Sequence, residues 1–207
     1  MDNILIGITS RDENINGVVH KIISKNNTKY LHGKCSYIGL IDYKNDIDLN
    51  ILKICDGIIL TGGTDIYEYH FKIVNYCLNN NIPILGICMG HQILGLYSFN
   101  GKDEDLIKIN GHYKTEHTIK INKDSSLQSI LGDKIVVNSR HNYALPKDKI
   151  NYKIGATSND GIIESIEDID DNHFLLGVEW HPEDMDNMEG LYNYFLKEVL
   201  IRKKTRQ

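Results

Sequence analysis

Several features that mark special classes of protein are absent from this sequence of 207 residues. Its apolar runs are all shorter than the roughly 18 residues that a membrane span needs. The N-terminal segment M-D-N-I-L-I-G-I has no basic residue and too short an apolar stretch to act as a secretory signal. Positive charge is not in excess, because 28 acidic residues outnumber 23 basic ones and leave a net charge of −5. We therefore expect a cytoplasmic protein that binds neither membranes nor nucleic acids.

Cysteine is scarce and follows no paired pattern. The sequence has four cysteines: Cys35, Cys55, Cys77 and Cys88. They show neither the C-x-x-C spacing of redox and zinc motifs nor the density of a disulfide scaffold, so we expect reduced thiols. Among the nine histidines, His112 and His117 are the nearest pair that could suggest a metal, and we expect no metal site there.

The overall composition is typical of a globular protein. Hydrophobic residues make up 41% of the chain and charged residues 25%, which are ordinary proportions. In the first half, short apolar runs alternate with helical patterns, and this alternation predicts a mainly parallel sheet covered on both faces. The expected strands lie at residues 3–9, 37–41, 56–60 and 83–87, and the expected helices at 67–80 and 88–96.

The second half favours antiparallel additions to that sheet, including a hairpin around S-N-D-G at residues 158–161. The expected strands lie at residues 116–121, 135–139, 152–157, 162–166 and 174–180, and the expected helices at 125–131 and 186–202. We interpret the acidic stretch at 164–171 as a solvated edge of the hairpin. Residues 11–34 fit a helix, a strand pair or an active-site flap. Without a repeat or a linker, residues 1–207 are expected to form a single α/β domain.

The strongest chemical feature is G-I-C-M-G at residues 86–90, directly after an apolar strand and before a helix. With serine in place of cysteine, this spacing is the nucleophile elbow of hydrolases, a sharp turn that projects the nucleophile outward. A Cβ at either glycine would clash in such a turn. The following helix points its N–H groups at the sulfur, so we expect a stabilised Cys88 thiolate and an oxyanion donor at Met89 N–H. The alternative is a buried cysteine in a glycine-rich turn.

A second feature is W-H-P-E at residues 180–183, at the end of the last predicted strand. A thiol nucleophile needs a general base, and the base needs an acid that fixes its tautomer. His181 and Glu183 supply both from one loop. Taken alone, this segment also fits a plain surface turn.

Two more polar segments follow predicted strands. T-G-G-T-D at residues 61–65 contains Gly62 and Gly63, whose backbone N–H groups can approach a reacting carbonyl. A phosphate loop is a poor alternative because G-x-x-x-x-G-K-[ST] is absent. The pyrophosphate loop of ATP-consuming synthetases, S-G-G-x-D-S, also fits poorly. The segment at residues 137–143 gathers polar side chains that would line a crevice, or else form a loop without a ligand.

The ordered motifs T-G-G, G-I-C-M-G-H-Q, V-N-S-x-H and G-V-E-W-H-P-E, over about residues 55–185, resemble the class I glutamine amidotransferase-like superfamily. The last two motifs resemble its gamma-glutamyl hydrolase branch, which includes gamma-glutamyl-GABA hydrolases. The resemblance implies a flavodoxin-like three-layer α/β/α sandwich. It also implies a nucleophile, Cys88, a base and acid, His181, and an orienting carboxylate, Glu183.

The same resemblance implies further roles. Gly62 or Gly63 would form the oxyanion hole with Met89, and His117 would be structural. The gamma-glutamyl moiety would be held by Gln92 and by the loop of Asn138, Ser139, Arg140 and His141. Arg140 and the pair Asn142-Tyr143 depart from the N-S-x-H-x-Q pattern, so we expect them to shape the leaving-group side.

The implied activity is a cysteine-dependent hydrolase that needs no metal or organic cofactor. It would cleave the gamma-glutamyl amide bond of a small molecule and release glutamate. The leaving group stays open among an amine, GABA and a nucleotide phosphoramidate. The alternative is a glutaminase subunit that delivers ammonia to a partner synthetase, and a third hypothesis is a non-catalytic binding module. A homodimer is compatible with the sequence.

Overall fold

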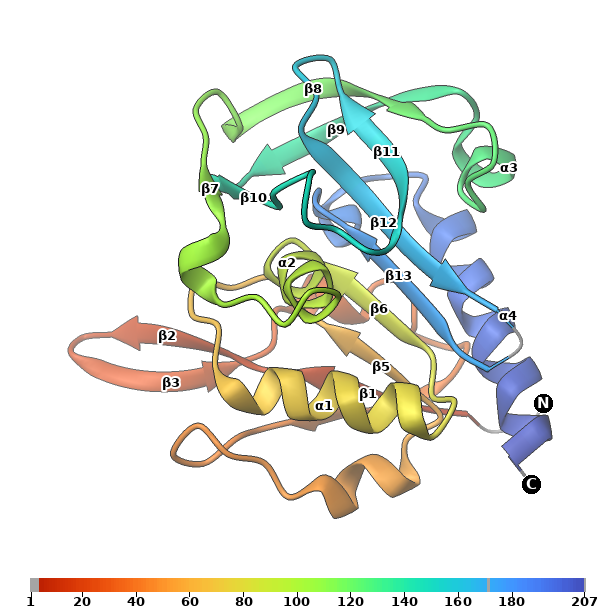
Figure 1. The fold of residues 1–207 in the computed structure, drawn as a ribbon. Helices are drawn as coiled ribbons and strands as arrows, with labels where there is room; N and C mark the ends of the chain where they lie inside the picture. Colours follow the sequence, from red (N-terminus) through yellow and green to blue (C-terminus); the bar gives the residue numbers. More distant parts are fainter. Residues whose placement is uncertain (1–3, 171, 207) are drawn as a thin grey trace.

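A mixed β-sheet forms the middle of the molecule in the computed structural model, which describes residues 4–170 and 172–206 (Figure 1). Within those residues, nine strands pair in the order β4-β1-β5-β6-β13-β12-β11-β8-β9. The first five strands in this order run parallel to one another. Their bounds are Ser36–Leu40 for β4, Leu5–Thr9 for β1, Gly57–Leu60 for β5, Ile84–Ile87 for β6 and Phe174–Val178 for β13.

The remaining four strands are antiparallel additions. Their bounds are Ile163–Ile169 for β12, Lys153–Ser158 for β11, Tyr113–Ile121 for β8 and Lys134–Arg140 for β9. Each pairs antiparallel with its neighbour. Four reversals separate β13 from β9, so β9 runs in the direction of the parallel strands. The carboxyl ends of β5, β6, β13 and β9 therefore meet at one edge of the sheet, which we call the catalytic edge.

Helices cover both faces of this sheet. They are α1 (Glu68–Asn79) and α2 (Met89–Tyr97) on one face, and α3 (Gln128–Leu131) and α4 (Glu189–Arg206) on the other (Figure 1). The sheet has one hydrophobic core on each face, because successive side chains of β5 point to opposite faces. Ile58 and Leu60 pack with α1 and α2, whereas Ile59 packs with α4. A strand buried on both faces is apolar at every position, as the sequence predicted.

Residues 11–34 form one of the three expected arrangements, a strand pair. The hairpin consists of β2 (Arg11–Ile15) and β3 (Val18–Ile22) and projects from the body of the molecule (Figure 1). Its turn, Asn16-Gly17, has positive φ at both residues, as a two-residue hairpin turn requires. The short 3-10 helix η1 (Lys25–Thr28) follows.

The strands and helices expected from hydrophobic patterning are present, with ends shifted by a few residues. The three-layer α/β/α fold class is thus confirmed. Sequence patterning missed the two-residue pair β7 (Ile107–Lys108) and β10 (Tyr143–Ala144) and the 3-10 helices η2 (Leu49–Ile54), η3 (Asp103–Asp105) and η4 (Pro182–Asp184). Such elements are too short to show a hydrophobic periodicity in the sequence. In the described part of the chain, no helix has the length and apolar character to cross a membrane.

The central position of Ile59 generates a stability prediction. Ile59→Ala should lower the free energy of unfolding by about 2–5 kcal/mol, because the cavity would lie in the core between β5 and α4. Ile41→Ala, at a side chain that is 62% exposed, should change it by less than about 0.5 kcal/mol. Urea unfolding of the two variants measures the difference. Equal losses would contradict the placement of Ile59.

Candidate active site

The G-I-C-M-G turn at the end of β6 forms the sharp elbow that its sequence predicts. Cys88 has φ 51° and ψ −107° at the N-cap position of α2, a backbone conformation that non-glycine residues rarely adopt. A Cβ on Gly86 would lie 2.6 Å from the carbonyl oxygen of Gly90. A Cβ on Gly90 would lie 2.2 Å from the carbonyl oxygen of Leu60 on β5. Glycine is therefore required at both positions.

His181 is held from two sides at the end of β13. Its Nδ1 lies 2.8 Å from Glu183 Oε1, because the short helix η4 turns the buried Glu183 back beside the ring. A proton on Nδ1 leaves Nε2 as the basic nitrogen. The Asn138 side chain clamps the backbone, since its Nδ2 donates to His181 O at 2.9 Å and its Oδ1 accepts from His181 N at 2.8 Å. The histidine is thus fixed by a carboxylate and by a side chain from β9.

The T-G-G turn after β5 brings the nucleophile and the histidine together. A Cβ on Gly62 would lie 2.7 Å from His181 Cε1 and 3.5 Å from Cys88 Cβ, so both side chains border this glycine. A Cβ on Gly63 would lie 3.0 Å from Met89 Sδ. The T-G-G turn therefore lies next to both Cys88 and the Met89 side chain.

The burial of Cys88 opposes the stabilised thiolate that the sequence led us to expect. Burial raises the pKa of Cys88 well above its usual value of 9.0, and the nearby Glu179 raises it further. The hydrogen bond from Met89 N–H lowers the pKa, as a helix N-terminus should, but this effect is smaller than that of burial. Attack by this sulfur would therefore need a base that removes the thiol proton.

Sequence reasoning missed Glu179, which is fully buried next to the elbow. Gln92 Nε2 donates to Glu179 Oε1 at 2.6 Å and to the carbonyl of Tyr143 at 3.2 Å. His91 Nε2 lies 3.3 Å from the other carboxyl oxygen. Burial raises the pKa of Glu179 well above its usual range, and the nearby Glu164 raises it further. Its position immediately before Trp180-His181 was the available signal.

Most of the side chains expected to bind substrate have partners within the protein. Ser139 Oγ donates to the carbonyl of His112 at 2.6 Å. His141 Nδ1 lies 2.9 Å from the carbonyl of Tyr143, and Gln92 and Asn138 are engaged as described above. In this arrangement the four residues position other parts of the site.

Arg140 also has a partner, and it lines a groove beside the His181 turn. Its guanidinium forms an ion pair with Asp184, and Asp184 also accepts from Asn26 Nδ2 at 2.6 Å. The groove has a volume of about 480 Å³. It is lined by Lys114, Thr115, Glu116, Asn138, Ser139, Arg140 and Asp184.

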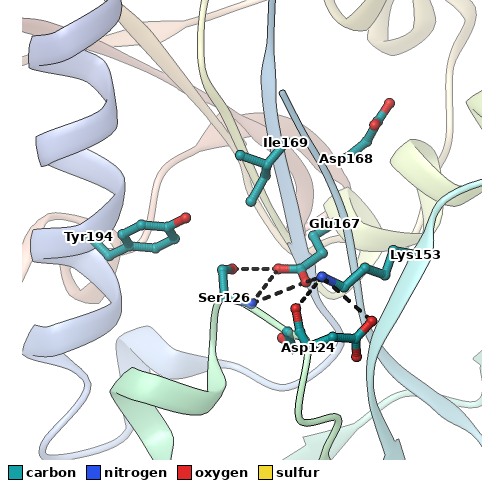
Figure 2. A pocket seen from close by; sticks show the side chains of 8 residues that line it. Asp124, Ser126, Lys153, Glu167, Asp168, Ile169 and Tyr194 are labelled. Atoms are coloured by element: carbon teal, nitrogen blue, oxygen red, sulfur yellow. Dashed lines mark hydrogen bonds and ion pairs between the residues drawn. The ribbon is translucent and has the colours of Figure 1, made fainter. Parts of the chain in front are cut away.

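The acidic stretch expected to be a solvated hairpin edge is partly buried, so that interpretation was wrong. Glu164 and Glu167 on β12 are both buried; residue 171 lies outside the described residues. Figure 2 shows why Glu167 is tolerated there: Ser126 donates to it from N, at 3.2 Å, and from Oγ, while Lys153 Nζ lies 2.9 Å from Oε1. These groups lie in a pocket of about 380 Å³, among residues of β11, β12 and α4, and they satisfy one another.

The fold is that of the class I glutamine amidotransferase-like superfamily, as the sequence resemblance predicted. The chain belongs to the Peptidase C26 family, whose model matches residues 68–183. Protein NtpR of Enterococcus hirae is 30% identical over 178 residues, which are 69% of this chain and 74% of that protein. One subunit of the glutamine-hydrolyzing GMP synthase of Methanosphaera stadtmanae is 34% identical over 127 residues, which are 61% of this chain and 64% of that protein.

Solved structures share the fold. The glutaminase domain of Trypanosoma brucei CTPS, determined with bound acivicin, superimposes with a TM-score of 0.71 at 15% identity. The match covers 96% of this chain and 94% of that one. The central sheet and flanking helices are therefore a common scaffold in this superfamily.

The raised pKa of Cys88 generates a prediction about its reactivity. Because the thiolate is the reactive form, alkylation of Cys88 by iodoacetamide should keep rising by about tenfold per pH unit from pH 6 to pH 9. Mass spectrometry of the Cys88 peptide measures the rate. Cys35, whose pKa burial raises to about 11, provides the internal control with the same slope. A plateau at Cys88 below pH 8 would mean that the thiolate forms at neutral pH after all.

Proposed function

We propose that this protein hydrolyses the gamma-glutamyl amide bond of a small molecule, with Cys88 as the nucleophile. The observation that carries the proposal is the meeting of Cys88 and His181 at Gly62, with Glu183 on the far nitrogen of the histidine. A thiol, a base and an orienting carboxylate in that order form a nucleophilic triad. Membership of the Peptidase C26 family supports hydrolytic chemistry.

The first half of the proposed reaction forms a thioester. His181 Nε2 accepts the thiol proton of Cys88 as the sulfur attacks the gamma-carbonyl carbon. The carbonyl oxygen becomes an oxyanion, which accepts hydrogen bonds from Met89 N–H and from the backbone N–H of Gly62 or Gly63. Removal of one such donor typically costs about 10²–10³ in rate. His181 then returns the proton to the departing nitrogen, and the C–N bond breaks.

The second half releases glutamate. Water enters beside His181, which removes a proton as the water oxygen attacks the thioester carbonyl. The C–S bond breaks, and the proton returns to the Cys88 sulfur. Glu183 stabilises the imidazolium that exists between the two transfers, and Asn138 keeps the backbone of His181 in place. These residues handle every proton, so we propose a reaction without an organic cofactor.

The groove beside Arg140 is the proposed leaving-group side. Asn138, which binds the His181 backbone, and Asp184, three residues after His181, both line it, so we propose that a nitrogen protonated by His181 departs toward this groove. Lys114 and Arg140 bring positive charge to its lining, and Glu116 and Asp184 bring negative charge. The leaving groups proposed are an amine, GABA or a nucleotide phosphoramidate.

The alternative function is that of a glutaminase subunit that supplies ammonia to a synthetase. It is supported by the similarity to one subunit of a glutamine-hydrolyzing GMP synthase. The two functions share every chemical step and differ in the leaving group. A stand-alone hydrolase turns over gamma-glutamyl amides without help, whereas a glutaminase stays slow on glutamine until its synthetase is added.

A panel of gamma-glutamyl compounds, with glutamate release as the readout, tests the proposed function. Wild-type protein alone should release glutamate from at least one compound, and Cys88→Ala should lower kcat by at least about 10⁴-fold. Cys35→Ala, at a half-buried thiol outside the site, should keep full activity. Diazo-oxo-norleucine should label Cys88 and spare Cys35, Cys55 and Cys77. Activity retained by Cys88→Ala, with its fold checked by thermal melting, would contradict the nucleophile assignment.

The position of Arg140 predicts a specificity effect. Arg140→Met should raise KM about tenfold for a compound with an anionic leaving group, because about 1.4 kcal/mol of charge-assisted binding would be lost. It should change kcat little and leave KM for a neutral leaving group unchanged. Lys134→Met, at the exposed start of β9, is the control for a change of net charge. An equal rise in KM for charged and neutral compounds would remove Arg140 from the leaving-group side.

A further inference from the structure

Three histidines and a glutamate, which we call the His–Glu cluster, gather in the antiparallel half of the sheet: His112, His117, His141 and Glu164. His112 lies just before β8, His117 on β8, His141 just after β9 and Glu164 on β12. Glu164 is fully buried, and His112 and His141 are each 4% exposed. Three ring nitrogens surround Glu164 Oε1: His117 Nε2 at 2.8 Å, His112 Nδ1 at 3.6 Å and His141 Nε2 at 3.9 Å.

The outward nitrogens of two of these rings are already bonded. His112 Nε2 lies 3.0 Å from Asp160 Oδ2, and His141 Nδ1 lies 2.9 Å from the carbonyl of Tyr143. An acceptor on the outward nitrogen places the ring proton there and leaves a lone pair on the inward nitrogen. His112 Nδ1 and His141 Nε2 are buried and have no hydrogen-bond partner in the described part of the chain, and the same holds for Glu164 Oε2.

His117 Nε2 can donate to Glu164 Oε1, but the two inward imidazole nitrogens and Glu164 Oε2 remain buried acceptors without a donor, which is costly. Here two imidazole lone pairs point at a buried carboxylate. A cation between them would satisfy all three groups at once. Imidazole and carboxylate are zinc ligands, and a ligating histidine characteristically donates its other ring N–H to a carboxylate or a backbone carbonyl. Asp160 and the Tyr143 carbonyl occupy those outer positions.

The spacing also suits a zinc ion. Tetrahedral zinc with bonds of about 2.0–2.2 Å separates its ligand atoms by about 3.3–3.5 Å. The three nitrogen-to-oxygen distances, from 2.8 to 3.9 Å, lie on both sides of that value. The ligand atoms of His112, His117 and Glu164 all lie within 4.8 Å of one another. Small side-chain movements would complete the coordination.

We propose that His112, His117 and Glu164 bind one zinc ion, with His141 Nε2 as the fourth ligand. The sequence led us to expect no metal at His112 and His117. Pairing of β8 with β9 and of β11 with β12 brings a third imidazole and a carboxylate to these two histidines, and we therefore propose a metal site there. It is independent of the proposed amide hydrolysis.

The zinc would have a structural role. It would join β8, β12 and the end of β9, the strand that carries Asn138 and Ser139 toward the catalytic edge. Glu164 is itself linked to that edge, because its carbonyl accepts from Glu179 N at 2.8 Å. The metal would therefore help to hold the antiparallel strands in place beside the parallel strands that carry Cys88.

Metal content and zinc titration test the proposal. Full-length protein purified without chelator should contain one zinc per chain by mass spectrometry of the metal. After removal of the metal with EDTA, zinc chloride should bind at one equivalent and raise the melting temperature. The same titration in Cys88→Ala should be unchanged, because the thiol is not a ligand. Glu164→Gln and His117→Gln should weaken binding at least 10–100-fold. His173→Gln, at a histidine paired with Asp168 outside the cluster, should bind as wild type.

Two results would overturn the zinc site. One is equal zinc affinity in wild type and Glu164→Gln. The other is loss of binding in His181→Gln alone, which would place the ion at the acidic turn of His181, Glu183 and Asp184. Cobalt absorption keeps the test decisive where a variant does not fold. Cobalt(II) added to the EDTA-treated Cys88→Ala protein should give the intense visible bands of a tetrahedral site, and a weak octahedral spectrum would contradict the proposed ligands.

Discussion

The strained backbone of Cys88 is the constraint on which the rest of the site depends. The residue stays at positive φ because Gly86 and Gly90 let the chain pass within contact of itself and of Leu60 on the neighbouring strand. The elbow is therefore in contact with β5 as well as with β6. The turn that follows β5 consequently begins beside Cys88, so one close approach of backbones places both the sulfur and the glycine pair.

The second half of the site comes from strands that lie beyond β6 in the sheet, on the side away from β5. His181 follows β13, which pairs with β6, but its backbone is held by Asn138 from β9, four strands further along the sheet. The antiparallel additions are therefore part of the site. They supply Asn138, which holds the backbone of His181, and further buried polar side chains close to Gln92.

Electrostatics around the sulfur favour a neutral resting state. Glu179 and Glu183 both raise the pKa of Cys88, in addition to the effect of burial, and Arg140 only partly opposes them. In the proposed reaction, proton transfer to His181 would therefore accompany attack of the sulfur on the substrate, and the new charge would move to an oxygen that faces backbone N–H groups.

The hydrophobic periodicity and the turn residues of the sequence predict much of the fold. Strands such as β5 and β6 are apolar at every position because both faces are covered, and the glycine spacing around Cys88 identifies the elbow. The short elements β7, β10 and η4 could not be predicted, since two or three residues carry no period. The hairpin in residues 11–34 was one of three options, because its strands lack a buried face.

The sequence by itself determined the α/β class, the strand ends at which polar residues gather and the order of Cys88, His181 and Glu183 along the chain. Only the tertiary structure decided which groups meet: Asn138 with His181, Gln92 with Glu179, and Glu164 with three histidines. Those contacts join elements that are distant in the chain, and their partners are set by the order of the strands in the sheet. Burial was decided in the same way, because Glu164 stands in an acidic stretch whose local pattern is that of an exposed strand.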